Sequence, residues 1–263
     1  MILTQWIILL FFFATILPSQ VIAGIIGSDN FDYADGSLVS NGYWETHSGR
    51  AGDLVVSGGT AIVQHGAPSE DTHIAFSSRP GNLYYGLDLS VTAESVITGS
   101  DSEYFAHFKD AGSNFAARLD VVPALGGGDF SLGIATDSST ADSTWATDLV
   151  FDTTYRALVK YDQIINLALL WIDASLPTDV FITGNTLASP ADLISQFALR
   201  QSDSSQNETI RIDNLIVGTS FEDVAEPFAI AIPEPGTLAM LLFGFLYFSF
   251  KSGKTQSSRS ITF

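Results

Sequence analysis

Apolar and polar residues alternate over short runs along most of the chain between residues 24 and 224. The clearest runs are 83–91 (LYYGLDLSV) and 115–122 (FAARLDVV), and turn residues such as 126–128 (GGG) separate one run from the next. A period of two interrupted by turns is typical of β-strands. The same pattern predicts further strands at 53–57, 61–64, 104–108, 130–134, 155–161, 167–172 and 208–217.

The strands are short, lie at nearly regular intervals and are accompanied by few helical patterns. This arrangement favours an all-β fold, an antiparallel β-sandwich. Residues 53–57 and 61–64 flank Gly58 and Gly59, which predicts a hairpin. Residues 189–197 are compatible with one short helix or a turn, because Ser189 can cap a helix and Pro190 suits its first position. No repeat of fixed period is present, and we expect one domain over 24–226.

An apolar run of 12 residues, 6–17 (WIILLFFFATIL), lies near the N-terminus. It is too short to cross a hydrocarbon core of about 30 Å comfortably as a helix. Pro18 and Ser19 end it, and Val21 and Ala23 place side chains of small or modest size three positions and one position before a cleavage site after Ala23. Residues 1–23 therefore predict a secretory signal peptide, although residues 1–5 contain no Lys or Arg. The alternative is a retained membrane anchor.

A second apolar run of 14 residues, 237–250 (TLAMLLFGFLYFSF), is followed by the basic residues Lys251, Lys254 and Arg259. Positive charge beyond an apolar helix keeps that end in the cytoplasm. A helix of this length reaches only about 21 Å, so flanking residues must contribute or the bilayer must thin. Residues 233–235 (PEP) precede it, and their prolines keep the backbone extended.

The tripeptide Pro233-Glu234-Pro235, the apolar helix 237–250 and the basic tail 251–263 follow one another in the order of the PEP-CTERM sorting signal of Gram-negative bacteria, which residues 227–263 resemble. The resemblance implies that exosortase, a membrane-embedded sorting protease, recognises the tripeptide. It also implies export through the secretion translocon, a transient inner-membrane anchor and then the cell surface or extracellular matrix. An ordinary C-terminal anchor would share every feature except the tripeptide.

Several segments of residues 29–224 together resemble the concanavalin-like or laminin-G-like jelly rolls of bacterial envelope proteins. The segments are 31–39 (FDYADGSLV), 42–44 (GYW), 47–49 (HSG), 149–161 (LVFDTTYRALVKY), 170–172 (LWI) and 212–224 (IDNLIVGTSFEDV). This resemblance implies a jelly-roll β-sandwich and carries no catalytic signature.

The charge of the chain excludes several classes of partner. The sequence contains 29 acidic and 11 basic residues, a formal net charge of −18. All the acidic residues but only eight basic ones lie in 24–235, which gives that part −21. Such a charge argues against electrostatic binding of nucleic acids or anionic membranes. The absence of cysteine excludes disulfides and thiolate metal sites.

No catalytic motif is present in the sequence. Related jelly-roll hydrolases carry Glu-x-Asp-x-x-Glu on one strand, whereas the glutamates here are isolated. A Gly-x-Ser-x-Gly elbow is absent, and the four histidines, His47, His65, His73 and His107, are too scattered for a zinc motif. For His107, within an alternating run, we expect a surface position or a satisfied place in the sheet. The sequence therefore predicts a protein that is not an enzyme.

Calcium is the metal that the sequence favours, as a structural ion, because Ca²⁺ prefers oxygen ligands. Acidic loops supply the candidate ligands Asp29, Asp32, Asp137, Asp142 and Asp213. None of these loops matches a defined calcium motif, and acidic residues in a secreted protein also serve plain solvation.

Aromatic side chains can stack on sugar rings or fill the core. Trp171, within an apolar run, is expected in the core. Trp145, in a loop rich in Ser, Thr and Asp, is the candidate ligand contact.

We therefore expect a secreted, surface-sorted, non-catalytic structural or adhesive protein of the bacterial envelope or extracellular polysaccharide matrix. A carbohydrate-binding, lectin-like module is the first alternative. A glycan-degrading enzyme is the second.

Overall fold

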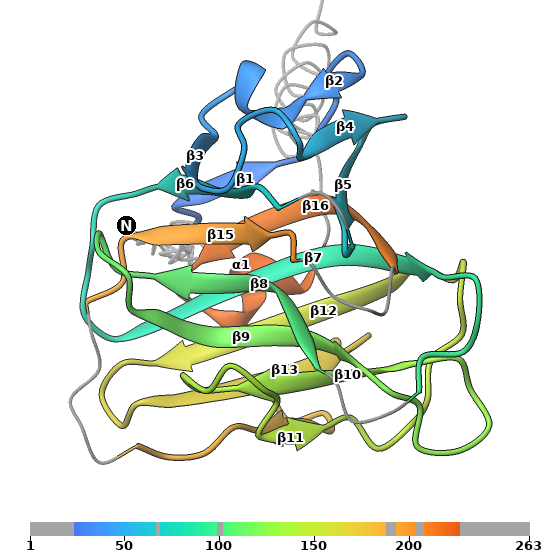
Figure 1. Cartoon of the computed structure of the whole chain (residues 1–263). Coiled ribbons are helices and arrows are strands. Elements are labelled where there is room, and N and C mark those ends of the chain that lie inside the picture. The colour runs from blue at the N-terminus through green and yellow to red at the C-terminus, as the bar shows by residue number, and fades with distance from the viewer. Residues whose placement is uncertain (1–23, 67–68, 99–101, 188–192, 203–207, 227–263) are drawn as a thin grey trace, which may run out of the picture.

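The computed structural model describes residues 24–66, 69–98, 102–187, 193–202 and 208–226, and these form two stacked antiparallel sheets with almost no helix. Figure 1 shows the second sheet, sheet B, in front of the first, sheet A. Sheet A has the order β14 (Ile182–Thr183), β13 (Leu167–Ile172), β12 (Tyr155–Asp162), β7 (Asn82–Thr92), β16 (Thr209–Gly218), β5 (Thr60–Gln64), β4 (Val55–Ser57) and β2 (Gly36–Ser37), with β1 (Gly27–Asp29) also paired to β16.

Sheet B has seven strands among the described residues, in the order β11 (Ser143–Thr144), β10 (Ser131–Ala135), β9 (Phe115–Val122), β8 (Glu103–Lys109), β15 (Gln196–Arg200), β6 (Asp71–Ala75) and β3 (Glu45–Ser48). A 3-10 turn, η1 (Leu38–Ser40), and a short helix, α1 (Phe221–Ala225), complete the described elements. The two-sheet sandwich predicted from the alternating pattern is confirmed.

The predicted strands correspond to β4, β5, β7, β8, β9, β10, β12, β13 and β16. The predicted hairpin is also present, since β4 pairs with β5 through Gly58 and Gly59. Both glycines have a positive φ, of 61° and 75°, as the two central residues of a type I′ hairpin turn require. The short helix considered for 189–197 is wrong for its last residues, because Gln196 begins strand β15, while 188–192 lie outside the described residues.

The main core lies between the two sheets and is rich in aromatic side chains. Tyr85 from sheet A contacts Phe108 and Phe197 from sheet B, with ring centroids 5.0 Å apart in each case. All three side chains are fully buried. The Tyr85 hydroxyl donates a hydrogen bond of 2.8 Å to the carbonyl oxygen of Ala117, so the polar end of this ring is also satisfied.

A smaller apolar cluster lies on the other side of sheet A, beneath α1. The Trp171 ring is buried there against Phe221 of the helix, with centroids 5.5 Å apart. The core position predicted for Trp171 is thus confirmed, but its neighbours belong to this outer cluster and not to the space between the sheets. A capping box between Ser220 and Asp223 starts α1.

No helix among the described residues is long and apolar enough to cross a membrane. The predicted signal peptide, 1–23, and the predicted sorting signal, 227–263, both lie outside the described residues.

Candidate ligand-binding face on sheet B

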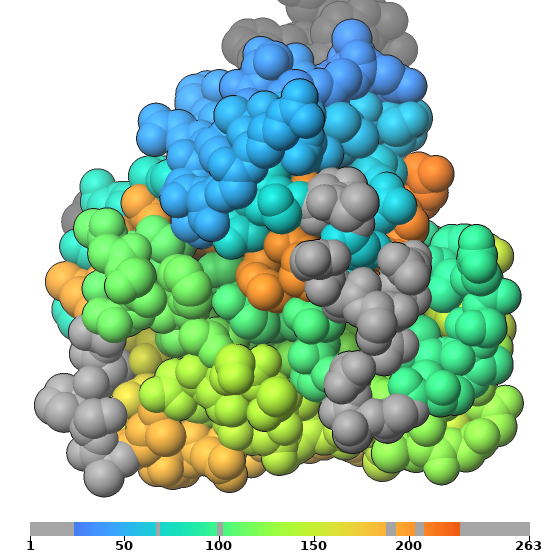
Figure 2. All heavy atoms as spheres, in the orientation of Figure 1, coloured from blue at the N-terminus to red at the C-terminus, as the bar shows by residue number. Residues whose placement is uncertain are grey.

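Sheet B turns one face to the core and the other away from sheet A; we call the outward face the sheet B face. On β8 and β9, Phe108 and Leu119 point into the core, whereas His107 and Arg118 belong to the outward set. Figure 2 views the molecule from this side and shows atoms of the N-terminal segment, in blue, next to the green atoms at the left of the view. The side chains that define the sheet B face are His47, His73, Tyr104, His107, Phe115, Arg118 and Arg200.

A β-bulge in β9 places two of these side chains together. Residues 115 and 118 would lie on opposite faces of a regular strand, because side chains alternate. The pairing of β8 with β9 shifts register between Phe108 and Ala106, and Ala117 has a left-handed φ of 52°. β9 thus has one residue more than β8 at this point, and the bulge turns Phe115 and Arg118 to the same side of the sheet. The Arg118 guanidinium carbon lies 5.5 Å from the centre of the Phe115 ring.

Three histidines from three strands meet on the sheet B face. Ala198 of β15 pairs with His73 of β6 on one side and with His107 of β8 on the other. His47 of β3 contacts both rings, with centroids 5.3 Å from His73 and 6.5 Å from His107. Phe115 closes the group, 4.7 Å from the His107 ring.

His47 and His107 are uncharged near neutral pH. Burial lowers the pKa of His47 to about 4, helped by the charge of Lys109, and it lowers the pKa of His107 well below its usual range. His107 is fully buried, and neither of its ring nitrogens has a hydrogen-bond partner in the described part of the chain. The expectation that His107 is a surface or satisfied residue is therefore wrong.

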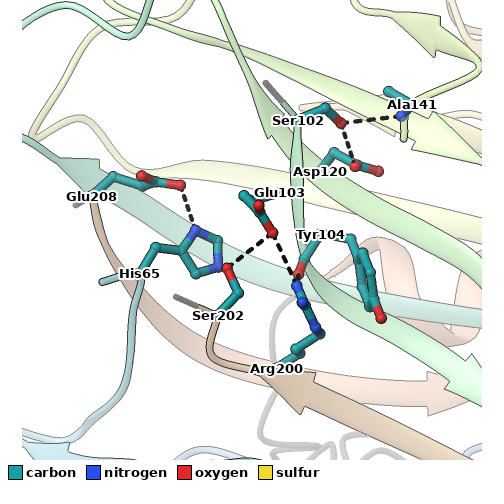
Figure 3. A network of polar contacts seen from close by, with 9 residues as sticks. All are labelled: His65, Ser102, Glu103, Tyr104, Asp120, Ala141, Arg200, Ser202 and Glu208. Carbon is teal, nitrogen blue, oxygen red and sulfur yellow. Dashed lines mark hydrogen bonds and ion pairs between the residues drawn. The ribbon is translucent and has the colours of Figure 1, made fainter. Parts of the chain in front are cut away.

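Two arginines stack on the ring of Tyr104. The guanidinium carbons of Arg118 and Arg200 lie 4.7 Å and 4.2 Å from its centre. Figure 3 shows Arg200 beside this ring and bonded to Glu103, at 3.1 Å, while Ser202 donates a second hydrogen bond to the same carboxylate oxygen. Arg118 makes no hydrogen bond or ion pair with any described residue, and its Nε is buried without a partner.

Two carboxyl groups on this sheet have raised pKa values. Burial raises the pKa of Asp120 to about 7 and that of Asp71 to about 6. Ser102 donates a hydrogen bond of 2.6 Å to Oδ1 of Asp120, as Figure 3 shows, whereas Oδ2 is buried and has no partner among the described residues. Asp120 is thus partly protonated at neutral pH and lies two residues from Arg118.

A separate buried pair connects the end of strand β5 with the start of strand β16 in sheet A. His65, just after β5, contacts the carboxylate of Glu208, just before β16, through its Nδ1 (Figure 3). Both side chains are fully buried. The backbone amide of His65 also donates to the carbonyl oxygen of Glu208, at 2.9 Å, which indicates a structural role for this pair.

The predicted calcium ligands are dispersed in the structure. The Asp29 carboxylate accepts hydrogen bonds from Trp44 Nε1, the Tyr33 hydroxyl and the Phe31 amide, at 2.6, 3.0 and 2.8 Å. Asp32 binds its neighbour Asn30, at 2.8 Å. These two carboxylates therefore already accept hydrogen bonds from groups of the protein.

The remaining candidate ligands lie elsewhere. Asp142 accepts from the amides of Thr136 and Asn185, and Asp137 is exposed. Asp213 borders a pocket of about 140 Å³ on the outer side of sheet A. Within the described ranges, no group of three or more His, Asp or Glu residues is arranged to hold a metal ion.

Trp145, the predicted ligand contact, follows β11 at the edge of sheet B and is half-buried. Its backbone amide donates to the Leu132 carbonyl oxygen, at 2.7 Å, and its own carbonyl oxygen accepts from Ser131 Oγ, at 2.9 Å. These two hydrogen bonds fix the position of the Trp145 backbone. Its role in binding stays a prediction.

Sequence reasoning missed the histidine cluster and Arg118. The histidines are separated by 26 and 34 positions in the chain, and only the pairing of β3, β6, β15 and β8 brings them together. Alternation identified His107 as facing away from its apolar neighbours, but nothing local indicated that His47 would lie over it.

No protein-family model matches this sequence, and no curated protein matches it. Among solved structures, a sialidase matches with a TM-score of 0.50 and 14% identity over 89% of this chain and 21% of that chain. The chain therefore spans about a fifth of the sialidase's length. A Lotus tetragonolobus seed lectin matches with a TM-score of 0.46 and 11% identity, over 68% of this chain and 94% of that one. At these identities the similarity is one of fold alone.

Proposed function

We propose that this chain is a non-catalytic adhesive protein that is exported, sorted to the bacterial surface and attached there to polysaccharide through the sheet B face. The observation that carries the binding proposal is the arrangement on one sheet of aromatic rings, imidazoles and a guanidinium, that of Arg118, which bonds to no other described residue. Aromatic faces pack against sugar rings, and convergent polar groups bind sugar hydroxyls. The lectin-like alternative is thereby preferred to a purely structural role.

The export and sorting part of the proposal is supported by the sequence of the two ends. Residues 1–23 have the layout of a signal peptide, and 227–263 combine the PEP tripeptide, apolar segment and basic tail. Exosortase and the secretion translocon are the partners that this layout implies. The binding proposal rests on the residues of this chain.

A glycan array probed with the purified full-length protein in detergent tests the binding proposal. We expect specific binding to a subset of glycans and reduced binding by the His47→Ala variant, with Tyr43→Ala, at an exposed aromatic residue nearby, as the matched control. Trp145→Ala measures the contribution of the half-buried tryptophan at the sheet edge. An array without any bound glycan would overturn the proposed binding function.

A glycan-degrading enzyme is the second candidate, because Asp120 has a pKa of about 7 and could donate a proton. Glycosidases need a second carboxylate about 5–9.5 Å away. Glu103 pairs with Val121, the neighbour of Asp120, so it is the candidate partner. Release of reducing ends from polysaccharides that is lost in Asp120→Asn would favour this enzyme over the adhesive protein.

A further inference from the structure

We propose that the sheet B face binds anionic saccharides, with the Arg118 guanidinium as the receptor for a carboxylate of the sugar. This inference rests on the proposed carbohydrate binding and names the class of ligand. It predicts that uronate-containing polysaccharides bind in preference to neutral ones.

The charge distribution of the body favours an anionic ligand on the sheet B face. Residues 24–235 carry a net charge of −21, yet three of their eight basic side chains, Lys109, Arg118 and Arg200, lie on sheet B strands and surround the histidine cluster. A small cationic area on a strongly acidic protein attracts an anion locally, while the remaining surface repels large polyanions that lack a matching site.

Only one of these three cations is left without a partner in the described structure. Arg200 is bonded to Glu103, and the Lys109 ammonium donates to the Gln196 side chain and, at 3.2 Å, to the Asp110 carbonyl oxygen. Arg118 has no such partner, and burial lowers its pKa. Arg118 is partly buried, and the carboxyl groups of Asp120 and Asp137 lie near enough to act on its charge without bonding to it directly in the described structure. A partly desolvated guanidinium that is not bonded to a carboxylate gains more from a ligand anion than a fully solvated one.

The side chain of Arg118 is held in one orientation by its aromatic neighbours. Its guanidinium packs against the rings of Tyr104 and Phe115, at 4.7 and 5.5 Å, so two aromatic contacts limit its rotation. A planar guanidinium that is already oriented binds a carboxylate through two parallel hydrogen bonds with little further loss of entropy. Phe115 beside it is partly exposed and can provide apolar contact for the sugar ring itself.

The nearby carboxyl group is compatible with an anionic ligand. Asp120 lies two residues from Arg118, and its Oδ2 has no partner among the described residues. It faces Ser102, Glu103 and Asp142 as well as Arg118. Because its carboxyl group is partly protonated near neutral pH, it repels a ligand carboxylate less than a surface aspartate would. Its protonated form can also donate a hydrogen bond to that ligand.

Isothermal titration of the full-length protein tests this inference. The ligands are polygalacturonate, alginate and hyaluronate, each paired with its carboxyl-reduced, neutral counterpart. We expect binding to at least one uronate polymer with at least tenfold higher affinity than to its reduced form. Arg118→Gln should lower that affinity at least tenfold, and Arg118→Lys, which keeps the charge without the planar fork, should lie between.

The matched control is Arg211→Gln, which removes the same charge from the exposed outer side of sheet A and should change affinity less than twofold. Thermal unfolding of each variant identifies any loss of folding. Equal affinity for charged and reduced polymers, or equal losses in Arg118→Gln and Arg211→Gln, would overturn the inference while glycan binding stands. Absence of binding to all six polymers also overturns it, and the proposed binding function fails only if the glycan array is blank as well.

Discussion

The guanidinium of Arg118 lies 4.7 Å above the ring of Tyr104, and the two residues come from neighbouring strands of sheet B. Tyr104 is itself the common support of two arginines, since Arg200 contacts the same ring. Arg200 forms an ion pair with Glu103, whereas Arg118 forms none with any described residue. The Tyr104 ring therefore orients the Arg118 guanidinium without occupying any of its hydrogen-bond donors.

Replacing Tyr104 by Leu should weaken the binding of a uronate polymer about three- to tenfold, because the ring contact with Arg118 is worth roughly 0.5–1 kcal/mol or more when it is partly buried. Tyr104→Phe keeps the ring and should bind nearly as well as the parent. Titration calorimetry on both variants makes the comparison. Equal affinities for the Leu and Phe variants would show that the ring does not support the binding residue.

Asp120→Asn should remove a pH dependence of stability. The carboxyl group has a pKa of about 7 in the folded chain and 3.8 as its ordinary value, so the folded state holds the proton more tightly. Its contribution to stability is fully present below about pH 4 and is lost as the pH rises through 7. The free energy of unfolding of the parent should therefore fall by roughly 2–3 kcal/mol more than that of the variant between pH 5 and 8.

Urea unfolding at several pH values, followed by tryptophan fluorescence, measures this difference. Asp71, whose pKa is raised to about 6, gives a pH dependence of the same sign in both proteins and so cancels in the comparison. Parallel stability curves for parent and variant would contradict the assignment of a raised pKa to Asp120.

Glu208→Ala should lower the free energy of unfolding by about 3 kcal/mol, because it leaves the fully buried imidazole of His65 without the partner of its Nδ1. The control is Glu222→Ala, an exposed position on α1 that should change stability by less than about 0.5 kcal/mol. Denaturant midpoints of the two variants, measured together, show whether the pair stabilises the fold.

Calcium binding is tested by chelation. If an ion binds the folded chain, EDTA should lower the melting temperature, since a ligand of the folded state stabilises it by mass action. Asp137→Ala, at an exposed candidate ligand, should reproduce the effect if that loop contributes. Superimposable melting curves with and without chelator, at matched ionic strength, would show that no calcium ion stabilises the folded chain.

Glu234→Ala tests the sorting signal. In a host with an exosortase, the variant should remain full length and membrane-bound, because the protease loses the centre of its extended recognition site. The double change Lys251→Glu and Lys254→Glu should disturb membrane orientation instead. Immunoblots of membrane and surface fractions distinguish these outcomes, and normal maturation of Glu234→Ala would leave a plain anchor as the explanation.

The local pattern of the sequence was sufficient to predict most strands. Alternation in 83–91 and 155–161 identified β7 and β12, and Gly58-Gly59 identified the β4–β5 hairpin. These signals depend on neighbours within a few residues, because side-chain direction in a strand and the conformation of a tight turn are local properties. β15 escaped detection because Ser189 and Pro190 suggest the start of a helix just before it.

The candidate site was decided by tertiary structure. Strand pairing places His73 and His107 on either side of Ala198, although they are 34 positions apart in the chain. The bulge at Ala117 turns Arg118 to the side of Phe115, against the alternation that the sequence shows. The sequence by itself determined which segments become strands, whereas register, bulges and strand order determined which side chains meet, because those depend on contacts between segments that are distant in the chain.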